Sequence, residues 1–166
     1  MRAVRGKAPA SIRSTAIRLL ARREYTRAEL ALRLRDRGAD AGDVAQTLDE
    51  LERLGYLSDA RYARMLITQR AGRYGKRAIA QTLARRGVAA DAAREALDEL
   101  PAGDELAQAT ALWERRFPQA PADDRERAKQ VRFLMSRGYA LSIALKVVRS
   151  VSESRRRPPA ESAGES

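Results

Sequence analysis

Three copies of one short pattern, L-x-x-R-G, constrain this chain more than any other feature of its sequence. They run from Leu34 to Gly38, from Leu83 to Gly87 and from Leu134 to Gly138, so that the glycines are 49 and 51 residues apart. A period near 50 residues is typical of an array of supersecondary units. A glycine in this position is also typical of a helix end, where it adopts the left-handed conformation that other residues avoid. The pattern therefore predicts a repeated helical unit.

Apolar residues continue the repeat after each glycine. They recur 6, 10 and 13 positions further on, at Val44, Leu48 and Leu51, then at Ala93, Leu97 and Leu100, then at Ala144, Val148 and Val151. Offsets of 6, 10 and 13 stay on one face of a helix. We expect the tyrosines, Trp113, Phe117 and Phe133 to pack in the core rather than to stack on bases.

Capping signals mark the starts of the helices. Thr26 with Glu29, and Asp123 with Glu126, have the spacing of a capping box, in which the first side chain accepts the amide of the second residue. Ser58 is placed to cap a further helix. Each repeat therefore contains three predicted helices.

The predicted fold is all-α, with three tandem three-helix units that resemble helix-turn-helix repeats. The units cover residues 11–57, 58–101 and 102–151, and the prolines fall outside the apolar-periodic stretches. Residues 1–10 are predicted to form a disordered basic arm. Residues 152–166 are rich in Ser, Glu, Arg and Pro, and are predicted to be a disordered tail because they have too little apolar surface to bury.

The absence of two residue types excludes most catalytic and metal sites. The chain has no cysteine and no histidine, so it cannot form a disulfide, a Cys/His zinc site or a Ser-His-Asp triad. It also lacks a Gly-rich phosphate loop, a run of about 18 apolar residues, and the apolar segment of a secretion signal. We predict a cytoplasmic protein that is not an enzyme, with no catalytic residues, cofactor, metal or membrane partner.

Charge is unevenly distributed along the chain. The formal net charge is +11, and the stretch from Ala60 to Ala90 has eight basic residues and no acidic one. Such a stretch repels itself, which favours a polyanionic partner such as nucleic acid. The predicted third helices are instead acidic, with five acidic residues in 40–52 and six in 91–105.

These acidic helices bear on the main alternative, a stand-alone helix-turn-helix regulator of DNA. Residues 26–59 look superficially like a winged helix-turn-helix, in which the last helix enters the major groove. Here that helix would bring five carboxylates toward the phosphates, which would repel them. The objection is weaker for the third unit, which has Lys146 and Arg149. An adaptor that binds another acidic protein is a further alternative.

Four stretches in the right order and at the right spacing resemble the RecX family. They are A-I-R-L-L-A-R-R-E-Y-T-R-A-E-L-A-L-R-L (16–34), L-D-E-L-E-R-L-G-Y-L-S-D-A-R-Y-A (48–63), R-A-G-R-Y-G-K-R-A-I-A-Q-T-L-A-R-R-G-V (70–88) and V-R-F-L-M-S-R-G-Y (131–139). The resemblance covers about residues 14–150. It implies an elongated, curved molecule that binds along the groove of the RecA–DNA filament and inhibits ATP hydrolysis, strand exchange and co-protease activity.

The resemblance also implies direct binding of single- and double-stranded DNA, and we expect a monomer. Together with the charge pattern, it places the contacts to filament DNA or acidic RecA loops on a basic ridge, with the acidic third helices facing basic RecA surface or solvent. The first-choice residues are Arg70, Arg73, Lys76, Arg77, Arg85 and Arg86, and the second-choice residues are Arg35, Arg37, Arg132 and Arg137.

Overall fold

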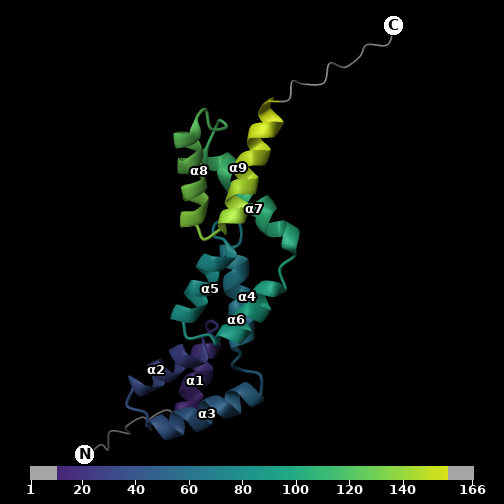
Figure 1. Cartoon of the computed structure of the whole chain (residues 1–166). Helices are drawn as coiled ribbons and strands as arrows, with labels where there is room; N and C mark the ends of the chain where they lie inside the picture. Colours follow the sequence, from purple (N-terminus) through teal and green to yellow (C-terminus); the bar gives the residue numbers. More distant parts are fainter. Residues whose placement is uncertain (1–10, 157–166) are drawn as a thin grey trace, which may run out of the picture. The chain divides into compact units, whose positions relative to one another are not determined.

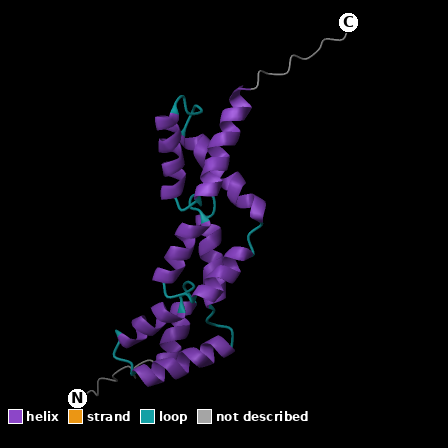
Figure 2. Cartoon of the chain, viewed as in Figure 1, coloured by secondary structure: helices purple, strands orange, loops and turns teal. Residues whose placement is uncertain are grey.

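The computed structural model describes residues 11–156, and within them it contains nine α-helices and no strand (Figures 1 and 2). The helices are α1 (Ile12–Leu20), α2 (Arg27–Arg35), α3 (Ala41–Arg53), α4 (Asp59–Arg70), α5 (Lys76–Arg85), α6 (Ala90–Asp98), α7 (Ala102–Arg116), α8 (Asp124–Ser136) and α9 (Leu141–Arg156). The all-α prediction is confirmed. The predicted arm, 1–10, and residues 157–166 of the predicted tail lie outside the described part of the chain.

The repeated pattern ends α2, α5 and α8 in the same way. Its three glycines have φ angles of +86°, +80° and +88°, the left-handed region predicted for them. In each copy the leucine carbonyl accepts the N–H of the residue after the glycine, at 3.3, 3.1 and 3.2 Å. This is the hydrogen bond of a Schellman motif, which satisfies carbonyls that the end of a helix would otherwise leave without partners.

The predicted helix starts are confirmed, but neither glutamate accepts the amide of its own capping residue, and Glu126 accepts the Ala122 amide at 3.0 Å instead. The Thr26 hydroxyl accepts the Glu29 amide at 3.0 Å, and an Asp123 carboxylate oxygen accepts the Glu126 amide at 2.7 Å. The Glu29 carboxylate does not reach back to the Thr26 amide, because it pairs with Arg86 far along the chain.

Contacts divide the described residues into two compact units. One contains residues 11–68 and 81–97, and the other contains 69–80 and 98–156. Helices α1–α3 and α4–α6 lie in the first two predicted repeat intervals and α7–α9 begin in the third, but the residues of α5 are divided between the two compact units. That each interval forms a separate domain stays a prediction.

The first unit has a core of aliphatic side chains from α1, α2 and α3. Leu30, Leu34, Val44, Leu48 and Leu51 are at most 2% exposed. The last four of these are positions that the repeat pattern predicts to face inward. In α1 the buried residue is Ala16, whereas Ile17 and Leu20 only pack against the edge of this core.

The same unit contains a joint between the first turn of α2 and the end of α5. The fully buried Thr26 hydroxyl donates a hydrogen bond of 2.7 Å to the carbonyl of Arg86. Gly87 follows, and a Cβ on this glycine would lie 2.5 Å from the Cβ of Ala28. The turn can therefore approach α2 this closely only with glycine at position 87.

The second unit contains a joint of the same kind, between the first turn of α5 and the end of α8. The buried Gly75 amide donates to the carbonyl of Arg137 at 2.9 Å, and the Arg77 amide donates to the carbonyl of Gly138 at 3.3 Å. A Cβ on Gly138 would overlap Ala78. Gly75 precedes Leu83 by eight residues, as Thr26 precedes Leu34, so the two joints use equivalent positions of the repeat.

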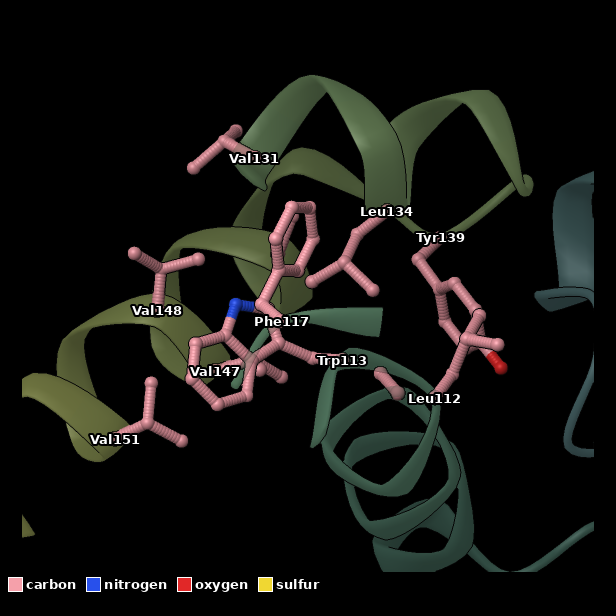
Figure 3. Close-up of a cluster of buried hydrophobic side chains, with 11 residues drawn as sticks. Leu112, Trp113, Phe117, Val131, Leu134, Tyr139, Val147, Val148 and Val151 are labelled. Atoms are coloured by element: carbon pink, nitrogen blue, oxygen red, sulfur yellow. The ribbon is translucent and has the colours of Figure 1, made fainter. Parts of the chain in front are cut away.

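The core of the second unit is built around Trp113 of α7 (Figure 3). Trp113 is fully buried, its indole N–H donates to the buried Gln130 side chain at 2.9 Å, and its ring centroid is 6.0 Å from that of Phe117. Tyr139, beside α9, is 1% exposed, and burial followed by the nearby Glu105 carboxylate raises the pKa of its phenol.

Helix α9 extends beyond the predicted repeat boundary at residue 151. Residues 152–156, predicted as the start of the disordered tail, continue the helix to Arg156. Val151 is buried in the core, the Ser152 hydroxyl donates to the Val148 carbonyl, and Arg149 pairs with Glu153 one turn further on. These local contacts support a last turn that has no apolar residue of its own.

The joints predict different costs for alanine at two glycines with nearly the same backbone. Gly38 and Gly87 both end a helix with positive φ, but only Gly87 has a neighbour, Ala28, in the way of a Cβ. We expect Gly38→Ala to lower the free energy of unfolding by about 1–2 kcal/mol through backbone strain. We expect Gly87→Ala to cost about 1–3 kcal/mol more through overpacking. Urea unfolding followed by circular dichroism measures both, and equal costs would contradict the joint.

The Trp113–Gln130 contact predicts a second stability effect. Gln130→Met keeps most of the side-chain volume but removes the Gln130 oxygen that accepts the buried indole N–H, which should cost about 1–3 kcal/mol. Gln130→Glu keeps an acceptor oxygen and serves as the control for the hydrogen bond at a pH where the carboxyl is neutral. Thermal unfolding followed by the fluorescence of Trp113 measures both variants, and a Met variant as stable as the parent protein would contradict the contact.

Candidate nucleic-acid interface

The side chains of the stretch G-Y-L-S-D-A-R-Y-A (55–63) form contacts that hold neighbouring segments of the chain together. Arg61 donates to both carboxylate oxygens of Glu24 and to the carbonyls of Gly55 and Tyr56, which ties the start of α4 to the end of α3. Asp59 accepts the Arg27 amide at 2.8 Å and so caps α2. Arg61 is therefore a basic residue whose donors already have partners.

The acidic third helices differ from one another. In α3, Asp49 and Glu52 both pair with Arg27 at 2.7 Å, and Glu50 pairs with Arg13. These carboxylates are therefore partly neutralised within the chain, whereas we expected them to face a partner or solvent. In α6, the exposed carboxylates of Asp91, Glu95 and Asp98 form no ion pair with a described residue.

Two of the predicted site residues already have acceptors within the chain. The Arg86 guanidinium pairs with Glu29, and this hydrogen bond raises the pKa of Arg86. Its carbonyl also forms the joint with Thr26. Arg37 donates to the carbonyl of Arg33 in its own helix, at 2.8 Å. Arg37 keeps the rest of its donors for an external ligand, but Arg86 is held mainly by its structural partners.

Most of the predicted site residues have no carboxylate partner. Among the described residues no acidic side chain lies within 4 Å of the cationic nitrogens of Arg73, Lys76, Arg77, Arg85, Arg35 or Arg132. Arg73, Lys76, Arg77 and Arg132 belong to the second unit, and Arg35 and Arg85 belong to the first. Cations without internal partners remain available to an external polyanion.

Arg70 and Arg137, from two different helix ends of the second unit, converge on one aromatic ring. Their guanidinium carbons lie 5.2 and 5.9 Å from the centroid of Tyr74, so the two charges are at most about 11 Å apart. Arg137 also lies 5.3 Å from the ring of Phe133. Within the described residues, neither guanidinium forms an ion pair or hydrogen bond. A guanidinium on an aromatic face keeps its edge donors directed outward, which suits phosphate binding.

Tyr74 is the functional candidate that the sequence analysis missed, since it assigned the aromatic residues to the core. That assignment is confirmed for Trp113, Phe117 and Tyr139. It is wrong for Tyr56, which is 53% exposed, and incomplete for the half-buried Tyr74. The available signal was the position of Tyr74 next to Arg73, within the acid-free stretch.

Two other classes of site find no support in the part of the chain that is described. No helix within residues 11–156 is long and apolar enough to cross a membrane. Over the same residues, no three His, Cys, Asp or Glu side chains are grouped so that they could hold a metal ion.

Comparison with known proteins gives the same family over three consecutive segments. Residues 13–51, 58–97 and 103–148 match the models for the first, second and third three-helix domains of RecX. The regulatory protein RecX of Leptothrix cholodnii is 44% identical over 139 residues, which cover 84% of this chain and 88% of the relative. That of Halorhodospira halophila is 45% identical over 136 residues, 81% of this chain and 84% of the relative.

A solved structure supports the fold. The crystal structure of RecX from Lactobacillus salivarius matches with a TM-score of 0.79 at 18% identity, over 86% of this chain and 95% of that one. The order of the three matched domains agrees with the order of the three helix triplets. The chain therefore belongs to the RecX family of regulatory proteins.

Proposed function

We propose that this protein is a negative regulator of RecA that binds the RecA–DNA filament and inhibits its ATPase, strand-exchange and co-protease activities. Membership of a family of regulatory proteins, with relatives more than 40% identical over most of their length, is the observation that carries the proposal. A regulator of this kind acts by binding in the cytoplasm and needs no catalytic residues or cofactor.

The distribution of unpaired cations supports a polyanionic partner. Arg73, Lys76 and Arg77 have no carboxylate partner among the described residues and lie close together in sequence. A filament of RecA on DNA offers such a partner in its phosphates, and binding would release counterions and depend on salt. Arg85, Arg35 and Arg132 are further candidate contacts.

The stand-alone DNA regulator remains the second candidate, and it is less well supported. The helix that would enter the groove carries Asp43, Asp49 and Glu52 in the first triplet and Asp91 and Glu95 in the second. In the third triplet, Arg149 of α9 forms an ion pair with Glu153. Lys146, the other basic candidate of this helix, forms no ion pair with a described residue. Specific duplex binding without RecA would favour this alternative.

The proposal predicts a loss of function when the central free cations are removed. The parent protein at substoichiometric amounts should strongly inhibit DNA-dependent ATP hydrolysis by RecA of the same organism. Replacing Arg73, Lys76 and Arg77 together with alanine should weaken both the inhibition and the binding to the filament. The slope of log affinity against log salt should fall by about 0.7 for each lost contact to a single-stranded phosphate.

A control variant removes the same charge from another place in the same unit. Arg125, Arg127 and Lys129 of α8 also form no ion pair with a described residue. Their replacement by alanine should leave inhibition close to that of the parent. If both triple variants inhibit equally, net charge accounts for binding and the assignment of the ridge is wrong. If the folded parent does not inhibit RecA, the proposed function itself fails.

A further inference from the structure

We propose that Arg70, Tyr74 and Arg137 form a clamp for a backbone phosphate of nucleic acid. The proposal rests on the proposed function, because it takes nucleic acid as a ligand of the basic surface. It goes further by assigning this cluster to DNA rather than to RecA, and by giving a tyrosine outside the predicted contacts a part in binding.

The fold brings two cations together at one aromatic ring. Two guanidinium groups lie 5.2 and 5.9 Å from the centre of one half-buried ring. Arg70 comes from the end of α4 and Arg137 from the end of α8, so the two like charges are brought together by the fold and not by sequence proximity. The ring stabilises each cation, but it supplies no negative charge to neutralise them.

Among the described residues, no carboxylate forms an ion pair with either of these two cations. Two acidic side chains, Asp104 and Glu105, line a small cavity together with Tyr74 and Lys76. Glu105 accepts the Lys76 amide at 3.3 Å, and neither carboxylate forms an ion pair with a described residue. The guanidinium pair is therefore left without an internal counterion, and an external anion would stabilise it.

Both cations are arginines, and the planar shape of the guanidinium group suits a phosphate. A guanidinium over the face of a ring keeps the N–H donors at its own planar edge available, and this fork matches two oxygens of a phosphate. Nucleic acid offers phosphates in series, so Arg73 and Arg77, in the same unit, can contact neighbouring groups along the strand. An isolated carboxylate on a protein also matches the fork, but it offers no further anionic group in series for the other cations of the unit.

The structure offers a matched control for the stacked geometry. Arg116 lies 5.2 Å from the ring centroid of Phe117, which equals the distance of Arg70 from Tyr74. It belongs to the same unit, but among the described residues Arg116 is the one cation over that ring. Arg116→Gln therefore removes one stacked charge without touching the proposed clamp.

The test measures binding of a fluorescent oligothymidylate by anisotropy over a series of chloride concentrations, with no RecA present. Arg70→Gln and Arg137→Gln should each lower the affinity about tenfold. Removing both cations should reduce the salt slope by about 0.7 in total, because together they neutralise one phosphate. The double variant should lose less than the product of the two single losses, because both cations hold the same phosphate. Tyr74→Leu should weaken binding without changing the charge.

Each other outcome overturns the clamp in a distinct way. If Arg70→Gln and Arg137→Gln behave like Arg116→Gln, the cluster does not bind the strand. If they bind the oligonucleotide normally but fail to inhibit RecA, the cluster contacts protein. Loss of helical circular dichroism is not expected, because the joint uses the carbonyl of Arg137 and not its side chain.

Discussion

The fold depends on one repeated contact, the docking of an R-G turn onto the first turn of an earlier helix. In the first unit the carbonyl of Arg86 accepts the Thr26 hydroxyl, and in the second the carbonyl of Arg137 accepts the Gly75 amide. Both contacts satisfy a carbonyl at a helix end and bring two backbones close together. Because a Cβ at Gly87 or Gly138 would overlap the partner helix, glycine meets a steric requirement there in addition to its backbone conformation.

Several basic residues form ion pairs within the chain. Only the basic residues without such partners remain fully available to a ligand. Arg27, Arg61 and Arg86 each connect two separate segments of the chain through carboxylates. Each has partners distant in sequence, and none is free to neutralise a phosphate with all its donors. Arg73 and Arg77 make no such contact, so they contribute to the surface potential and not to the helix packing. A high net charge alone therefore says little about where a polyanion binds.

Features with local causes could be predicted from the sequence, and features with distant causes could not. The helix ends at the three glycines, the cap at Thr26 and the inward apolar positions follow from residues a few positions apart. Glu29 has the local signature of a reciprocal cap, but a guanidinium 57 residues away takes its carboxylate. The convergence of Arg70 and Arg137 on Tyr74 joins two repeats, and no spacing within either one predicts it.

Three copies of the glycine pattern form two joints, because each joint pairs the glycine turn of one repeat with the helix start of the repeat before it. The residue equivalent to Thr26 and Gly75, eight before the leucine, is Glu126. In α8 this residue already lies inside the helix, which starts at Asp124 and is capped by Asp123. At the other end, Gly38 has no described atom within 4 Å of a Cβ, so its backbone conformation alone requires glycine. One motif thus has a purely local role in the first repeat and an additional packing role in the other two.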